Sequence, residues 1–335
     1  MVDLPDPALA GHLLLLHLAG RLPDELMTSC RRWLADGATG DVAVAVTDAV
    51  LADDVELVAE DLEVLHDLLA AAAGVDTAVL DEVDVMEHVA LSSYWFSAEP
   101  PDGVDEIDSE VPADRLATVA VAAASTRPEQ VLGLWQAWRI TPDELSLGAK
   151  QVFIVEAAGG DLPELAAMLQ DALIGAGQIN PQVEVCPVGA RVTSYQRAAR
   201  GYGTLLWASA DRPLRRVEVF DEIDPQTGPR FAADHPRLSD PQERARIVGY
   251  LRGAQPVLVT TKARDIVTAQ PAPTVPLNVR TDGTFIWPEA AGYYLERYEL
   301  APDPDLLAAI RAHGYVAPPV DAVTAQRAVA QMMRR

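Results

Sequence analysis

Apolar residues in the first third of the chain recur every three or four positions, which is the spacing of one face of a helix. The clearest stripe lies between Asp54 and Gly74, and its apolar members are Leu57, Val58, Leu62, Leu65, Leu68 and Leu69. A second helix is predicted to begin after Pro23, with two acids in its first turn, and to end at Gly37. Further helices are predicted at 7–19, 41–52 and 76–83. Residues 1–96 are therefore expected to form an all-α module.

Beyond residue 115, short apolar runs typical of buried strands alternate with helical stripes. Strands are predicted at 117–123, 151–156, 182–186 and 204–208. Capping boxes at Thr126–Glu129 and Asp161–Glu164 predict the starts of two helices, and a third helix is predicted from Thr193 to Arg200. The first of these helices would carry the stripe Val131, Leu134, Trp135 and Trp138. Strand and helix in strict alternation are typical of right-handed crossovers, so we expect a mostly parallel sheet with helices on both faces.

The pattern loosens after residue 210. Strands are predicted at 215–220 and 256–261, and Asp282-Gly283 between apolar runs at 274–280 and 284–287 predicts a hairpin. Helices are predicted to follow Asp240, Pro288 and Asp303, and a last helix runs from about Ala322 to the end. The expected fold class is α/β with an N-terminal all-α module. Its mostly parallel, mixed sheet comprises a parallel core at 115–210, extended at 211–335 by mixed or antiparallel strands, a C-terminal hairpin and closing helices.

Negative charge is concentrated at one end of the chain. The 335 residues include 50 Asp and Glu against 26 Lys and Arg, a net charge of −24. Residues 1–114 alone hold 26 acids and 3 bases, and no Lys or Arg occurs between Arg32 and Arg115. The stretch 97–114 is rich in acids and prolines and is interpreted as a linker, which leaves 115–335 as a separate α/β domain. Direct nucleic-acid binding by the acidic third is excluded, because phosphates are bound by cations.

The sequence lacks the established signatures of catalysis and of metal or cofactor binding. It contains no phosphate loop, no dinucleotide fingerprint, no nucleophile elbow and no zinc motif. Its two cysteines, Cys30 and Cys186, are too few for a disulfide framework. The histidines of the acidic third are not at metal-ligand spacing, so we expect no metal and no cofactor. The apolar run Leu13–Leu16 is too short for a signal peptide or a membrane span, which indicates a cytoplasmic protein with no membrane contact.

One candidate site remains at the carboxyl ends of the predicted parallel strands, where open α/β sheets bind ligands. Ser125, Thr126 and Arg127 follow the first predicted strand, Glu156 ends the second, and Arg191 follows the third. Hydroxyls, cations and helix-terminal amides at this edge could bind an anion or a nucleotide. The same residues are also ordinary in turns between strands and helices, and that interpretation stays open.

Two segments, Gln196–Trp207 and Arg280–Leu295, resemble sequences of actinobacterial proteins, a resemblance that implies no fold and no activity. Our leading hypothesis is a non-catalytic protein-binding protein, of the immunity, scaffold or assembly type, whose acidic module binds a partner with a basic surface. The acidic excess would also serve solubility alone. The alternative is an enzyme or small-ligand sensor that uses the sheet-edge residues above, and a homo-oligomer is compatible with either.

Overall fold

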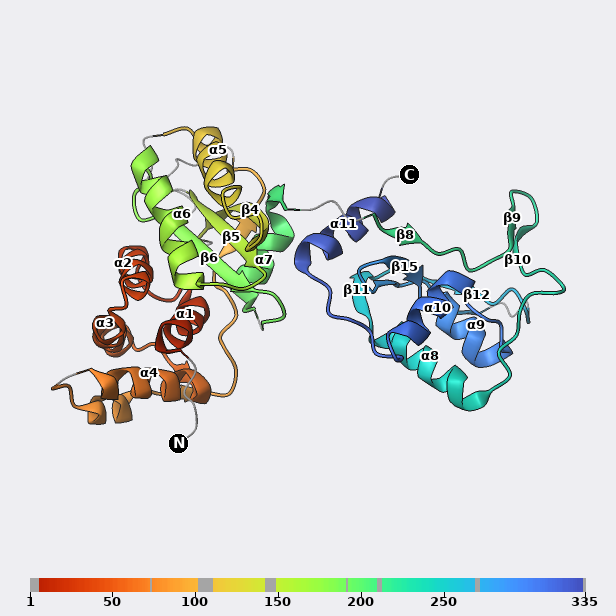
Figure 1. The fold of residues 1–335 in the computed structure, drawn as a ribbon, viewed down its shortest axis with the longest axis horizontal. Coiled ribbons are helices and arrows are strands. Elements are labelled where there is room, and N and C mark those ends of the chain that lie inside the picture. Colours follow the sequence, from red (N-terminus) through yellow and green to blue (C-terminus); the bar gives the residue numbers. More distant parts are fainter. Residues whose placement is uncertain are drawn as a thin grey trace. The chain divides into compact units, whose positions relative to one another are not determined.

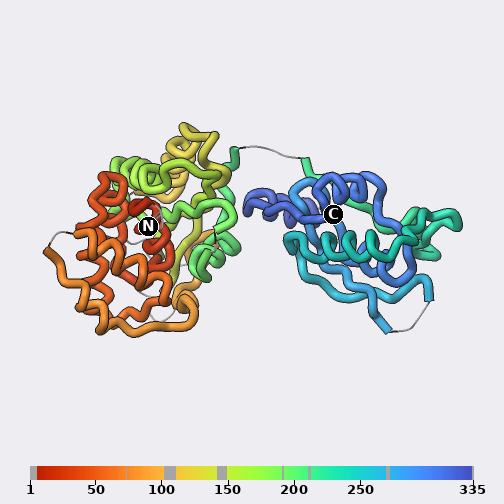
Figure 2. The backbone as a smooth tube through the Cα atoms, turned by 60° about the horizontal axis from the view of Figure 1, so that its bottom comes forward, coloured from red at the N-terminus to blue at the C-terminus, as the bar shows by residue number. Residues whose placement is uncertain are grey.

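The computed structural model describes residues 6–72, 74–101, 111–141, 149–190, 192–209, 213–268 and 272–333, which fold as a mixed α/β protein. The chain divides into two compact units, residues 1–210 and 211–335 (Figures 1 and 2). Residues 1–96 thus lie in the same unit as the first sheet, and the division falls at residue 210, not within the expected linker at 97–114. Residues 102–110 of that linker lie outside the described residues. In the described ranges, every helix is too short or too polar to cross a membrane.

The helices expected in the acidic third are present. They are α1 (Pro7–Leu18), α2 (Asp24–Ala35), α3 (Thr39–Ala52), α4 (Ala59–Ala71) and the 3₁₀ helix η1 (Thr77–Glu82). Two short strands, β1 (Leu57–Val58) and β2 (Val85–Met86), pair in parallel beside them. The apolar stripes of these helices meet in one core that includes Leu18, Met27, Val46 and Leu65. Burial of these stripes, at about 25 cal/mol per Å² of apolar surface, accounts for the helical packing.

The first unit also holds a five-stranded sheet. Its strands are β3 (Trp95–Ser97), β4 (Val131–Ile140), β5 (Ala149–Ala157), β6 (Gln182–Pro187) and β7 (Thr204–Ala208). The order is β3-β4-β5-β6, and β7 pairs with β4 as well. Only β5 and β6 run parallel, whereas the pairs β3/β4, β4/β5 and β4/β7 are antiparallel. The expectation of a mostly parallel sheet is therefore wrong for this unit.

The sequence prediction exchanged two neighbouring elements. Residues 113–124 form helix α5 (Ala113–Ala124), where a strand was expected, and residues 131–140 form β4, where a helix was expected. Alanine has the highest helix propensity, so the alanine-rich run extends as a helix although it is apolar. In β4 nearly every side chain is buried, and a strand covered on both faces shows no alternation to tell it from a helical stripe. Thr126–Glu129 lies in the turn between the two elements.

The exchange also explains the strand directions. Because β4 is followed by β5 with no helix between them in the described residues, the two strands pair antiparallel. Helix α6 (Leu162–Ala176) does connect β5 to β6, and that pair is parallel as expected. Asp161 caps its first turn by accepting a hydrogen bond from the Glu164 amide at 2.9 Å, and Gly177 ends it at φ 107°.

Helices cover both faces of this sheet. Apolar residues of α5 and α6 pack on one face against Phe153, Val155, Val183 and Val185. Side chains alternate along a strand, so Glu184 points to the opposite face. That face meets α2 and helix α7 (Ser194–Tyr202), and α1 and α2 lie next to β6 and α6 (Figure 1).

The second unit is a four-stranded sheet with helices. Its strand order is β11 (Gln255–Leu258), β14 (Val279–Thr281), β15 (Phe285–Pro288) and β8 (Arg215–Arg216). The predicted hairpin at Asp282-Gly283 is confirmed between β14 and β15, where Gly283 has a φ of 87°. Smaller hairpins pair β9 (Glu222–Asp224) with β10 (Gly228–Arg230), and β12 (Lys262–Arg264) with β13 (Pro273–Pro276). The predicted strand at 274–280 is therefore divided between β13 and β14.

Four helices complete this unit. Helices α8 (Pro241–Gly253), α9 (Ala290–Tyr298) and α10 (Pro304–Ala312) share a core with Trp287 and Phe285. Helix α11 (Ala322–Met333) packs against Val279 and Ile286 through Ala328. The closing helices expected from the caps at Asp240 and Asp303 are thus confirmed.

Candidate functional site: a cavity beside the acidic segment

An open cavity of about 510 Å³ lies in the first unit, where α1, the first turn of α4, β2 and the first turn of α7 meet. Its size is within the range of about 300–1,000 Å³ found for ligand pockets. Its apolar walls are Val58, Val85, Met86, Val89, Leu91 and Val192. Its polar lining includes His17, Glu60, Glu87, His88, Ser194 and Arg197. The site therefore offers apolar surface together with charged groups.

His17 is held by a buried carboxylate. Nδ1 of His17 lies 2.7 Å from Oδ1 of Asp61 on α4, whose side chain is 6% exposed. Oδ2 of Asp61 makes no hydrogen bond within the described residues. A carboxylate on one ring nitrogen fixes the orientation of the imidazole and adds negative potential beside the cavity.

The exposed acids of residues 36–87 have few cationic neighbours: Asp67 and Glu87 lie 3.7 and 3.9 Å from His66 and His88, and Glu56 lies in the field of Arg21. We call residues 36–87 the acidic segment, which contains no Lys or Arg. Its exposed carboxylates are Asp36, Asp41, Asp48, Asp53, Asp54, Glu56, Glu60, Glu63, Asp67, Asp76, Asp81, Glu82, Asp84 and Glu87. Among the residues that the structure describes, none of them forms an ion pair with Lys or Arg from elsewhere in the fold. The charge asymmetry of the sequence is therefore an unneutralised charge on the surface.

Large apolar side chains are exposed next to these acids. Leu91 is 83% exposed, Trp95 on the edge strand β3 is 61% exposed, and Val85 on β2 is 57% exposed. Scattered apolar residues are normal on a surface, but these three lie within eleven residues, and Val85 and Leu91 also line the cavity, so a partner could bury them there.

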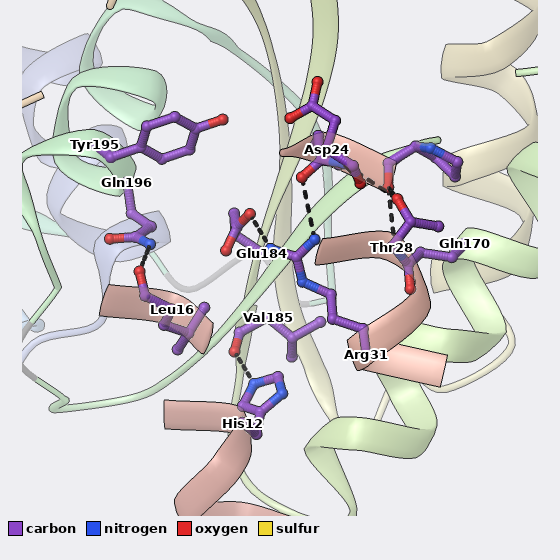
Figure 3. Close-up of polar contacts among 12 residues, drawn as sticks. His12, Leu16, Asp24, Thr28, Arg31, Gln170, Glu184, Val185, Tyr195 and Gln196 are labelled. Atoms are coloured by element: carbon purple, nitrogen blue, oxygen red, sulfur yellow. Dashed lines mark hydrogen bonds and ion pairs between the residues drawn. The ribbon is translucent and has the colours of Figure 1, made fainter. Parts of the chain in front are cut away.

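A buried polar cluster holds α2 against the sheet (Figure 3). Asp24 of α2 accepts two hydrogen bonds from Arg139 on β4, at 2.9 and 2.5 Å, and lies 3.1 Å from Nζ of Lys150 on β5. Burial opposes ionisation of Asp24, yet Arg139 and Lys150 lower the pKa of its carboxyl below the usual value. Tyr195 of α7 accepts from Arg139 at 3.5 Å, so the same cluster reaches the helix that lines the cavity.

A second ion pair of this cluster is fully buried. Arg31 of α2 donates to Glu184 of β6, and the two side chains are 1% and 0% exposed. Arg31 also donates to Oε1 of Gln182 at 3.2 Å. Burial raises the pKa of Glu184, although Arg31 favours its ionised form. Such a pair fixes the position of α2 against β6, because burying either charge without the other would cost stability.

Side chains also bind the backbone of neighbouring elements. Nε2 of His12 on α1 donates to the carbonyl of Val185 at 2.7 Å, and Gln196 of α7 donates to the carbonyl of Leu16 at 2.6 Å. Val185 lies on β6, which ends the strand order, so His12 satisfies an edge carbonyl. These two contacts, drawn in Figure 3, set α1 and α7 in place. They thereby position His17 and Ser194, which line the cavity.

The residues of the predicted anion site have other partners. Ser125 and Thr126 follow helix α5 and donate to the carbonyls of Ala122 and Ala123, at 2.8 and 2.7 Å. Arg127 pairs with Glu164 of α6 at 3.2 Å. Glu156 is buried and pairs with Arg200 of α7 at 3.7 Å. The three residues 125–127 thus lie together in one turn, whereas Glu156 lies at the end of β5, and Arg191 lies outside the described residues.

Both cysteines are buried. Burial raises the pKa of the Cys30 and Cys186 thiols to about 12, so neither forms a thiolate readily. No group of three or more His, Cys, Asp or Glu side chains in the described residues is placed to hold a metal ion. The cavity was not singled out by the sequence, because its lining comes from four separate segments.

No protein-family model matches this sequence, and its comparison with curated proteins and with solved structures yields no match. The function of the site must therefore follow from its own chemistry.

Proposed function

We propose that this protein is a binding protein that docks a cationic protein partner on its acidic segment. The observation that carries the proposal is the coincidence, on the described part of residues 36–95, of exposed carboxylates without a Lys or Arg ion pair, exposed apolar side chains and the 510 Å³ cavity. The proposal concerns binding, and the cytoplasmic immunity, scaffold or assembly roles expected from the sequence would all be forms of it.

Electrostatics supports a cationic partner. Like charges fixed on one surface repel each other, and this repulsion is relieved when a partner brings Lys or Arg to them. Complementary charge also speeds association and selects against acidic partners. A purely solubilising surface would have no use for Leu91 and Trp95 left exposed among the acids.

Affinity would come from the apolar part of the site. Charged groups at the rim of an interface contribute little energy, whereas buried aromatic and aliphatic contacts contribute most of it. Trp95, Leu91 and the apolar cavity walls are the side chains available for such burial. We therefore expect salt to slow the association of the complex, and we expect apolar contacts to set its dissociation rate.

The test uses the full chain and a labelled peptide of alternating Lys and Val, about eight residues long, with fluorescence anisotropy as the readout. We expect saturable binding that weakens between about 50 and 300 mM salt. Asp48→Lys with Glu63→Lys is expected to weaken binding about tenfold, because it replaces attraction by repulsion.

The matched control is Glu218→Lys with Asp234→Lys, two exposed acids of the second unit, which makes the same change in net charge. This control is expected to bind as the unmodified chain does. An equal loss in both variants, or no binding of the peptide at about 50 mM salt, would contradict the proposal.

A further inference from the structure

The stretch that lines the cavity from β2 onward has an unpaired backbone. β2 belongs to a two-stranded sheet, so one of its edges has no strand beside it. After β2, the backbone N–H and C=O groups of Glu87, His88, Val89 and Leu91 make no hydrogen bond to any described part of the chain. The Ala90 carbonyl accepts from the Ser194 hydroxyl of α7 at 3.5 Å, and the Ser92 amide donates to the same hydroxyl at 2.7 Å. The Ser92 hydroxyl bonds the backbone of Tyr94.

The free edge of β2 is two residues long, and Glu87 and His88 form a bend beyond it. A free strand edge followed by unpaired backbone groups is a template for another strand. Its exposed donors and acceptors can pair with an extended peptide, which gains main-chain hydrogen bonds while its alternate side chains enter pockets. Here the pocket is already present, because Val85, Met86, Val89 and Leu91 line the cavity on the same stretch. Proteins usually cover an exposed strand edge, whereas Val85 on this edge is 57% exposed and lies beside the open cavity.

We propose that residues Val85–Leu91 bind an extended, cationic segment of the partner by strand addition. Alternate aliphatic side chains of the segment enter the cavity, and the intervening Lys or Arg side chains meet Glu60 and Glu87 at its rim. This inference rests on the proposed function and specifies its binding mode and its ligand chemistry.

Charge argues for this occupant over a second copy of the chain. A second copy would bring the same acids to the interface, at a net charge of −24 per chain. An acidic peptide would face Glu60, Glu87 and the buried Asp61 carboxylate, with Arg197 as the lining arginine. A peptide whose Lys or Arg side chains alternate with aliphatic ones complements both the rim and the walls.

Two forms of the Lys/Val peptide test the hydrogen bonds directly. One is N-methylated at alternate residues on one edge, and the other on the opposite edge. A strand pairs through one edge only, so one methylated peptide is expected to lose about tenfold or more in affinity while the other binds as the parent does. Hydrogen exchange on the full chain is expected to show new protection at Glu87–Leu91 when the parent peptide is bound.

Val89→Pro removes one backbone N–H of the stretch and is expected to weaken the parent peptide, with Ala98→Pro, an exposed position after β3, as the control. If Val89→Pro does not fold, the methylated peptides and the hydrogen-exchange data still test strand addition on the unmodified chain. Salt-dependent binding with equal affinity for both methylated peptides and no protection at Glu87–Leu91 would overturn strand addition and leave the acidic docking surface intact. Absence of any binding to the parent peptide would overturn both.

Discussion

At the scale of single residues, buried polar side chains join the N-terminal helices to the sheet. His12, Asp24 and Arg31 come from α1 and α2, and each contacts a strand of the sheet. Their partners stand more than a hundred positions away, and Arg31 is separated from Glu184 by 153 residues. No local pattern shows such a pair, which is why the acidic third reads as a self-contained bundle.

His12 predicts a loss of stability in mild acid. Burial lowers the pKa of His12 to about 4, below its ordinary value near 6.5, so the folded protein holds the neutral ring. The unfolded chain binds a proton below about pH 6.5, and stability is therefore lost as the pH falls from 7 toward 4. Between pH 7 and pH 5 we expect His12 to account for about 2 kcal/mol of this loss.

The measurement compares urea unfolding of the unmodified chain and of His12→Gln, which keeps a donor for the Val185 carbonyl but does not titrate. The variant is expected to lose about 2 kcal/mol less than the parent over that pH range. Identical pH dependence of the two would mean that His12 is not buried in its neutral form.

The Arg31–Glu184 pair predicts a large cost for removing one charge. Arg31→Met leaves Glu184 buried without its cation and is expected to destabilise the protein by about 3–5 kcal/mol. Arg31→Met with Glu184→Leu is expected to recover most of that loss, because no unpaired charge remains. Arg230→Met, which breaks the exposed pair with Glu222, serves as the control and should cost less than about 1 kcal/mol. If Arg31→Met costs as little as the control, the pair is open to water.

At the scale of elements, the spacing of apolar residues predicted the helices that have one apolar and one polar face. Helices with one apolar face were predicted where α4 and α6 lie, as were the capped α8 and α10, although Leu57 and Val58 of the predicted α4 stripe form strand β1. The predictions were wrong for α5 and β4, because their apolar runs show no periodic alternation that distinguishes a helix from a strand. Alanine propensity decided one and burial on both faces decided the other.

The helical state of residues 113–124 can be checked by making the substitution Thr→Ala once in this segment and, in a second variant, once in a strand. Thr118 is exposed in α5, and Thr118→Ala is expected to stabilise the protein by about 0.5 kcal/mol because alanine is the better helix former. Thr204 is exposed in β7, and Thr204→Ala is expected to destabilise it, because threonine favours strands. The free energy of unfolding from urea titration gives both values. A loss of stability in Thr118→Ala would support the strand that the sequence suggested.

At the scale of the whole molecule, charge and fold follow different boundaries. The charge changes near residue 115, whereas the compact units meet at residue 210. Composition therefore located the exposed carboxylates, but it does not show which strands share a compact unit with them. The open stretch Glu87–Leu91 could not be predicted either, because free backbone groups have no residue signature. Independent folding of residues 1–96 stays a prediction, and the contacts of α1 and α2 with β6 argue against it.

The central claim is that the acidic helices are part of the sheet's own unit, which positions the cavity where α1, α4, β2 and α7 meet. Native-state hydrogen exchange of the full chain in increasing urea tests it most directly. The account predicts that amides of α2 and of β5 and β6 exchange through one cooperative opening, with the same free energy and the same urea dependence. Exchange of α1–α4 through a separate opening that costs several kcal/mol less, while β5 and β6 stay protected, would contradict it.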